Sequence, residues 1–138
     1  KDDVLDSIAG VAPAFEIIQL RLGPEATLGD RLADSLSHWG IVVGLERTLD
    51  WRHFDFNGLV VTLKRNGMEV ERVAAAGHMD DHFRSIAAMS STLAKFDRQI
   101  LTGNRVITGS YTRQPVGSVG IWQGDFGEDL GVVEVEFA

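Results

Sequence analysis

The feature that most constrains this chain is the dipeptide Asn66-Gly67, which lies between two segments rich in β-branched and other apolar residues. An Asn-Gly pair in this setting strongly indicates a β-hairpin, because both central residues of the turn need positive φ angles. Antiparallel strands are therefore predicted over residues 59–64 and 68–73. Other short segments rich in β-branched and aromatic residues predict strands over residues 15–20, 41–43, 105–108, 119–122 and 132–137.

Two helices are predicted between these strands. Residues 28–38 and 82–96 carry apolar side chains three and four positions apart, which is the spacing of a helical face. Asp80 and Asp81 can cap the second helix. The mostly antiparallel strands and few helices predict an α+β fold, and no linker or repeat divides residues 1–138, so a single domain is expected.

The composition excludes several classes of protein. The chain has 138 residues and a net charge of −7, which argues against a nucleic-acid surface because phosphate binding needs clustered Lys and Arg. No apolar run reaches the roughly 18 residues that a membrane span needs, so no membrane partner is expected. The absence of cysteine excludes disulfides, zinc–thiolate sites and a cysteine nucleophile, and it is compatible with a cytoplasmic location.

Glu16 is the first candidate functional residue, because it is a charged residue inside a predicted strand. A carboxylate buried there without a partner would be costly, and it could instead ligate a hard cation such as Mg²⁺ or Mn²⁺. The alternative is that Glu16 points outward from a strand with one face in water.

Two groups of histidine and serine residues also merit attention. His78 and His82 have an i, i+4 spacing that could bind a metal on a helix, but they straddle the expected helix start, which favours capping and surface roles. Ser35 and Ser37 precede His38, yet the G-x-S-x-G motif of a serine nucleophile is absent.

Two loops complete the set of candidates. The turn Thr108-Gly109-Ser110 follows a predicted strand, and its N–H and hydroxyl groups could hold a carboxylate, although an ordinary turn has the same sequence. Asp125, Glu128 and Asp129 match neither a calcium loop nor a phosphate loop, so a solvated acidic loop is expected.

Taken in order, several segments resemble the 2-keto-4-pentenoate hydratase branch of the fumarylacetoacetate hydrolase superfamily, including its oxalocrotonate decarboxylases. The similarity covers nearly all of the chain. It is carried by Pro13-Ala-Phe-Glu-Ile17 with Arg21, by Ala33-Asp-Ser-Leu-Ser37 with Val42-Val-Gly44, by Gly77-His78, by Val106-Ile-Thr-Gly-Ser110 and by Gly131-Val-Val-Glu-Val-Glu-Phe137.

The resemblance implies a mixed, mostly antiparallel β-barrel-like fold with flanking helices. It implies a divalent cation, Mg²⁺ or Mn²⁺, held by three carboxylates, of which Glu16 matches one. The substrate would be a 2-keto or 2-hydroxy-dienoate acid from aromatic-compound breakdown, chelated by the metal for hydration or, in sister enzymes, decarboxylation. Arg21 and Ser110 match substrate-binding positions, and Ser37 matches a catalytic one.

Some residues depart from the family pattern. Gln19 and Leu20 replace an acidic residue and a serine, and the upstream E-x-E that supplies two metal ligands, with an acid–base lysine, has no match. One explanation is that the chain is the C-terminal part of a larger catalytic domain. The other is that it is a divergent homologue without catalysis, which binds a related decarboxylase or hydratase subunit. Family precedent implies a homo-oligomer.

Overall fold

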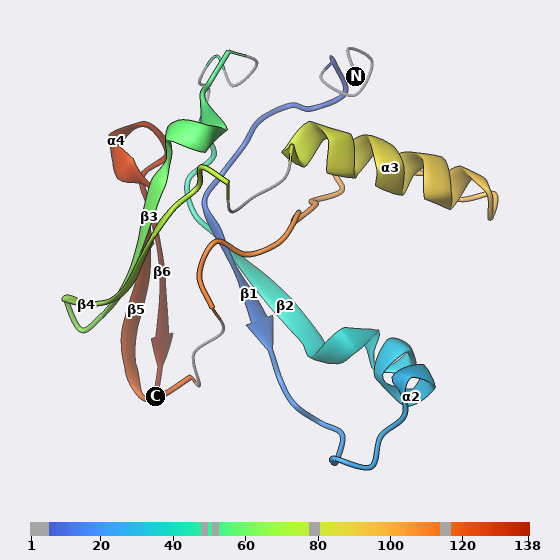
Figure 1. The fold of residues 1–138 in the computed structure, drawn as a ribbon, viewed down its shortest axis with the longest axis horizontal. Helices are drawn as coiled ribbons and strands as arrows, with labels where there is room; N and C mark the ends of the chain where they lie inside the picture. Colours follow the sequence, from blue (N-terminus) through green and yellow to red (C-terminus); the bar gives the residue numbers. More distant parts are fainter. Residues whose placement is uncertain (1–5, 48–49, 51–52, 78–80, 114–116) are drawn as a thin grey trace.

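The computed structural model describes residues 6–47, 50, 53–77, 81–113 and 117–138. The fold is α+β, as predicted, with a four-stranded sheet, a separate two-stranded sheet and a few helices (Figure 1). Every strand pairing in the described residues is antiparallel, so the expected mixed sheet is not found there. The described strands do not close into a single barrel, because the two sheets have separate hydrogen-bond ladders.

The four-stranded sheet has the order β4-β3-β5-β6. Strands β3 (Val60–Arg65) and β4 (Met68–Ala74) form the predicted hairpin. In its turn, Asn66 and Gly67 have φ angles of 50° and 79°, as the Asn-Gly pair requires. The other two strands are β5 (Gly120–Asp125) and β6 (Val132–Phe137).

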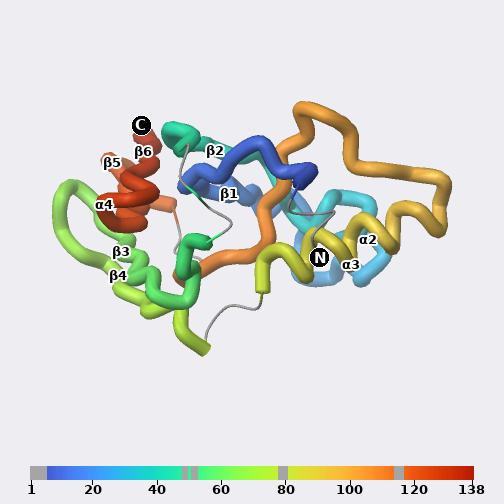
Figure 2. Tube along the Cα trace, turned by 90° about the horizontal axis from the view of Figure 1, so that it is seen from above, coloured from blue at the N-terminus to red at the C-terminus, as the bar shows by residue number. Residues whose placement is uncertain are grey.

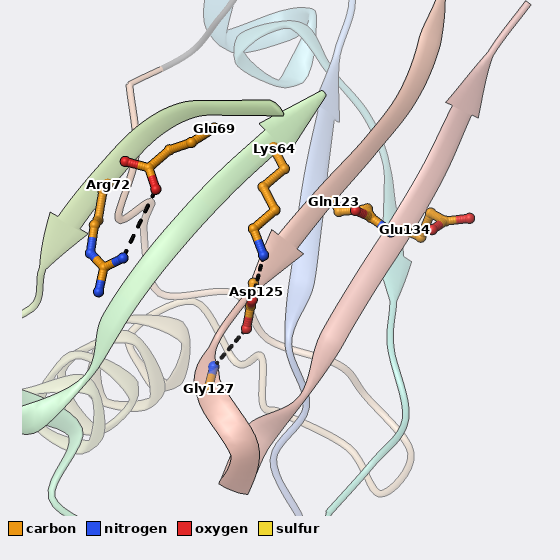
Figure 3. Close-up of polar contacts among 7 residues, drawn as sticks. All are labelled: Lys64, Glu69, Arg72, Gln123, Asp125, Gly127 and Glu134. Atoms are coloured by element: carbon orange, nitrogen blue, oxygen red, sulfur yellow. Dashed lines mark hydrogen bonds and ion pairs between the residues drawn. The ribbon is translucent and has the colours of Figure 1, made fainter. Parts of the chain in front are cut away.

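Alternation along these strands gives the four-stranded sheet two different faces. One face is apolar and carries Val61, Leu63, Trp122 and Val133, which are all buried. The opposite face is polar, and there Lys64 contacts Asp125 at 2.8 Å while Gln123 donates to Glu134 at 2.7 Å (Figure 3). Glu134 and Glu136 of β6 are exposed on this face.

Strands β1 (Ala14–Ile18) and β2 (His38–Val43) form the two-stranded sheet, which reaches away from the four-stranded sheet (Figure 1). The connection between the strands holds helix α2 (Leu28–Ala33) and a 3₁₀ turn, η1 (Ser35–Ser37). The predicted helix over 28–38 is thus too long. It ends at Ala33 because Ser35, Leu36 and Ser37 adopt left-handed φ angles, which an α-helix cannot contain.

Helix α3 (His82–Ala94) confirms the second predicted helix. Its N-cap is Asp81, whose side chain accepts hydrogen bonds from the N–H groups of Phe83 and Arg84. Asp80, the other proposed capping residue, lies outside the described residues. The short helix α4 (Gly127–Leu130) joins β5 to β6, and a 3₁₀ turn, η2 (Phe56–Gly58), precedes β3.

The predicted strand over residues 105–108 is wrong. Residues 100–113, called the return segment below, run back from the end of α3 to the middle of the molecule without joining either ladder (Figure 2). Positive φ angles at Gly103 and Gly109 bend the backbone on both sides of 105–108. Among the described helices, none is both long and apolar enough to cross a membrane.

Candidate active site

A cavity of about 1530 Å³ lies against the apolar face of the four-stranded sheet. Strand β1, one side of α3 and much of the return segment form the rest of its wall. Of the four residues proposed from the sequence, Glu16 and Ser110 line this cavity. Arg21 and Ser37 do not belong to the lining, so the structure separates the proposed residues into two groups.

Glu16 reaches the cavity from the middle of β1, where it lies opposite Ile41 of β2. Its Oε1 atom lies 2.9 Å from Nδ1 of His38, with 45% of the Glu16 side chain and 39% of the His38 side chain exposed. The carboxylate is therefore solvated and has a partner, and the desolvation cost considered for a buried glutamate does not arise. The oxygen that faces away from His38 remains suited to a cation or a hydrogen-bond donor.

Arg21 holds the segment that leads into β2. Its Nε atom contacts Asp34 Oδ1 at 2.8 Å, and its Nη2 atom donates to the carbonyl oxygens of Asp34 and His38 at 3.0 and 3.1 Å. Three contacts to one segment fix its path, because a guanidinium presents its donors in a rigid plane. In this structure Arg21 therefore organises the neighbourhood of Glu16 and His38.

Ser37 is buried inside the loop that Arg21 holds. It ends a run of three left-handed residues, with φ angles of 54° at Ser35, 54° at Leu36 and 68° at Ser37. Such non-glycine conformations cost on the order of 1–3 kcal/mol each and persist only where the surroundings enforce them. The carbonyl group of Ser37 accepts from Gln19 N–H at 2.9 Å. The segment that follows β1 therefore helps to hold these three residues in their left-handed conformation.

Ser110 reaches the cavity from the return segment, where its hydroxyl donates to the carbonyl oxygen of Thr112 at 2.8 Å. Within the part of the chain that the structure describes, the N–H groups of Gly109 and Ser110 have no hydrogen-bond acceptor. Two such donors beside a hydroxyl are suited to an anionic oxygen, as the turn sequence suggested.

His82 joins the return segment to α3. Its Nδ1 atom lies 2.6 Å from the Thr108 hydroxyl and its Nε2 atom 2.9 Å from the Tyr111 hydroxyl. The ring of Phe56 contacts the imidazole edge-on, with centroids 5.5 Å apart. Burial lowers the pKa of His82 below its ordinary value, against a smaller opposing effect of the Asp81 carboxylate. Burial also raises the pKa of Tyr111.

The metal pair proposed for His78 and His82 is not supported by His82, because both of its ring nitrogens contact hydroxyls. His78 lies outside the described residues. No local pattern indicates the actual partners of His82, which lie 26 and 29 residues further along the chain. Only the fold brings Thr108 and Tyr111 to the start of α3.

The acidic residues near the C-terminus are not part of the cavity. Asp125 accepts from Lys64 at 2.8 Å and from Gly127 N–H at 3.1 Å (Figure 3), so it starts the turn into α4. These two hydrogen bonds, with that of Lys64 the stronger, lower the pKa of Asp125. Glu128 and Asp129 are exposed, as expected, but they lie in the short helix α4 rather than in a loop.

The donors in the cavity do not by themselves complete a site for Mg²⁺. Among the described residues, no three histidine or acidic side chains lie close enough to share a metal ion. Glu16 and Glu46 are the carboxylates of the described lining, and Mg²⁺ needs near-octahedral oxygen coordination. The described residues therefore offer one suitably placed ligand, Glu16, and do not fit a whole metal centre.

Comparisons with known proteins place this geometry in context. No model of a protein family matches the chain. The 2-oxo-hept-4-ene-1,7-dioate hydratase of Escherichia coli is 27% identical over 143 residues, which cover 98% of this chain and 53% of the hydratase.

Solved structures of 4-oxalocrotonate decarboxylase from Pseudomonas putida G7 are also similar. The complex with magnesium and adipate has a TM-score of 0.77, and the complex with calcium and acetate has one of 0.75. Each is 26% identical to this chain and covers 98% of it, whereas this chain covers 52% of the decarboxylase. The chain thus spans about half the length of the relatives that it matches. In sequence and in fold, the chain is thus similar to a hydratase and a decarboxylase that act on small organic acids, which agrees with the resemblance to the hydratase and decarboxylase branch of the fumarylacetoacetate hydrolase superfamily.

Proposed function

We propose that this chain is part of a divalent-metal-dependent hydratase. Such a lyase would act on 2-hydroxy-2,4-dienoate or 2-keto-4-pentenoate acids in aromatic-compound breakdown. The observation that carries the proposal is that Glu16 and the Thr108–Ser110 turn line one cavity. These two elements lie far apart in the sequence, and both belong to the motifs that carry the resemblance to the family. The similarity to a hydratase of an unsaturated 2-oxo acid supports the substrate class.

Within this proposal, the return segment binds the carboxylate of the substrate. The N–H groups of Gly109 and Ser110 are the donors for that carboxylate, since the Ser110 hydroxyl already donates to Thr112. Arg21 acts from outside the cavity by holding the loop that ends in Ser37 and His38. We propose a supporting role for Ser37, because its buried position in that loop keeps it off the cavity lining.

The metal dependence rests on the relatives and on Glu16. The neighbouring decarboxylase structures contain magnesium or calcium, which supports a divalent cation. The described residues supply a single suitable carboxylate, that of Glu16. We propose Mg²⁺ or Mn²⁺, with its other ligands outside the described residues.

Two other functions follow from specific observations. The similar solved structures are of a decarboxylase, which favours a sister activity that releases CO₂ from a 2-oxo acid. The incomplete carboxylate set favours a non-catalytic homologue that binds a related hydratase or decarboxylase subunit. We further propose one domain over residues 1–138 that forms the C-terminal part of a larger catalytic domain, a homo-oligomer, and a cytoplasmic location.

The test is an assay of the full-length protein with 2-hydroxypenta-2,4-dienoate and either Mg²⁺ or Mn²⁺. Hydratase activity predicts a metal-dependent loss of the dienoate absorbance that Glu16→Gln abolishes. Glu136→Gln, which changes an exposed glutamate of β6, is the matched control and retains activity. Release of CO₂ from a 2-oxo acid would identify the decarboxylase instead. No metal-dependent turnover in either assay would contradict both enzymatic proposals.

A further inference from the structure

We propose that His82 is a positioning residue, which holds the Thr108–Ser110 turn in the wall of the cavity. It does so by binding the first residue of the turn, Thr108, and the residue that follows the turn, Tyr111. Only one part of this proposal rests on the proposed function, namely that the turn binds a carboxylate. The connection itself is a property of the fold. It concerns residues that none of the family motifs includes, apart from Thr108.

The return segment needs an external support because it belongs to no ladder. Residues 105–110 have no regular secondary structure, and the described hydrogen bonds within the segment are short-range, such as Asn104 N–H to the Leu101 carbonyl at 3.0 Å. Three described hydrogen bonds tie the segment to the rest of the fold. Two go to His82, and the third is from Arg113 N–H to Glu71 at 3.0 Å.

His82 is well placed to provide this support because its own position is fixed from two sides. His82 is the first residue of α3 and directly follows the N-cap Asp81, so the helix fixes its backbone. Its ring packs against Phe56, and Phe56 also contacts Phe83 with centroids 5.7 Å apart. A half-buried ring held in this way has few other rotamers available.

The chemistry of the three groups is complementary. A neutral imidazole has one N–H donor and one acceptor nitrogen, and each hydroxyl can take either role. Burial of His82 favours the neutral form, which matches this arrangement. Tyr111 is itself fixed, since its ring meets that of Phe126 edge-on with centroids 5.8 Å apart. The segment is therefore attached to α3 at Thr108 and to both α3 and Phe126 at Tyr111.

The hydrogen bonds to His82 determine which polar groups of the Thr108–Ser110 turn are available to bind a ligand. Because the Thr108 hydroxyl contacts His82, it is not the group that faces a substrate. Gly109 and Ser110 lie between the two attached residues, with backbone N–H groups that have no acceptor among the described residues. His82 thus fixes both ends of a short segment whose middle presents the donors.

Limited trypsin digestion measures the attachment without any assay of activity. Cleavage after Arg105 reports opening of the return segment, and cleavage after Lys95 or Arg98 is the internal control. His82→Phe keeps an aromatic ring beside Phe56 but removes both hydrogen bonds. We expect cleavage after Arg105 to become about tenfold faster, with cleavage at the control bonds changed less than about twofold.

His82→Gln separates positioning from simple packing, because its amide can both donate and accept. We expect it to restore much of the resistance at Arg105, whereas the matched control His53→Gln, at an exposed histidine, leaves all rates unchanged. An unchanged rate after Arg105 in His82→Phe, or an equal increase at every bond, would overturn the proposal.

Kinetics with 2-hydroxypenta-2,4-dienoate then test the link to carboxylate binding. We expect His82→Phe to raise KM about tenfold and to change kcat less than about threefold, since the turn binds the substrate and takes no part in the chemical step. A fall in kcat with unchanged KM would contradict the positioning role. If the wild-type protein shows no turnover, the proposed function fails, and the digestion experiment still decides the attachment.

Discussion

At the scale of single residues, His82 makes stability depend on pH in a defined direction. Its pKa in the folded protein lies below that of an unfolded histidine, which is about 6.5. As the pH falls below this value, the unfolded chain gains a proton that folded His82 does not. The free energy of unfolding therefore decreases until folded His82 is protonated as well.

Urea unfolding at pH 7.5 and at pH 5.5 measures this dependence. We expect His82→Gln to lose less stability than the wild-type protein over this interval, because it removes the titrating group. His53→Gln keeps the wild-type dependence. Identical losses in the wild-type protein and in His82→Gln would show that His82 titrates alike in the folded and unfolded states.

In contrast to His82, Glu16 is expected to matter for function and to contribute little to the stability of the protein. Its contact with His38 is nearly half exposed, and even exposed ion pairs contribute only about 0–1 kcal/mol. We expect Glu16→Gln to change the free energy of urea unfolding by less than about 1 kcal/mol while abolishing metal-dependent turnover. A large loss of stability would mean that Glu16 has a structural role.

At the scale of elements, the β3–β4 turn depends on its two residues. Gly67 has a φ angle of 79°, which alanine adopts only with strain, so we expect Gly67→Ala to destabilise the protein by about 1 kcal/mol or more. Gly29→Ala is the matched control inside α2. There an added Cβ meets Thr27 Oγ1 at an ordinary 3.6 Å, and helix propensity favours alanine, so stability is expected to rise slightly. Thermal unfolding compares both variants.

Local signals in the sequence were sufficient for the elements that depend on local chemistry. The Asn66-Gly67 hairpin, the Asp81 cap of α3 and the strand over residues 132–137 are all found as predicted. The strand predicted over 105–108 has the right residue types, but strand formation also needs a partner. Residues 105–108 join neither of the described sheets, so suitable residue types alone did not produce a strand.

Only those residues of the candidate site that belong to family motifs could be predicted from the sequence. Resemblance indicated Glu16 and Ser110, which line one cavity. It did not indicate that Arg21 contacts Asp34, nor that His82 binds two hydroxyls, because these contacts join residues far apart in sequence. Such contacts depend on the path of the whole chain, and no local pattern encodes it.

At the scale of the whole molecule, the chain exposes more surface than its size requires. Its accessible surface is 9774 Å². A compact monomer of 15.1 kDa has roughly 7,100 Å², so the surplus is about 2,700 Å². Leu28, Leu32 and Trp39, on α2 and β2, are among the large apolar residues that lie exposed.

We therefore expect further polypeptide to cover this apolar surface, either the rest of the larger domain proposed above or a second copy in the proposed homo-oligomer. A concentration series in sedimentation velocity measures self-association directly, and Leu32→Lys tests whether α2 takes part. Self-association predicts a mass above that of the monomer, which Leu32→Lys lowers. A monomer at every concentration would contradict the homo-oligomer.

The neighbouring positions of β3 and β5 have a consequence for how the molecule forms. Between Arg65 and Gly120 the chain makes β4, α3 and the return segment before it comes back to the same sheet. Closing so long a loop costs more conformational entropy than closing the two-residue turn between β3 and β4. We expect the β3–β4 hairpin to form early and β5 to add late. The cavity wall would then be among the last parts to take shape during folding, and the chain would acquire its binding surface only when the sheet is complete.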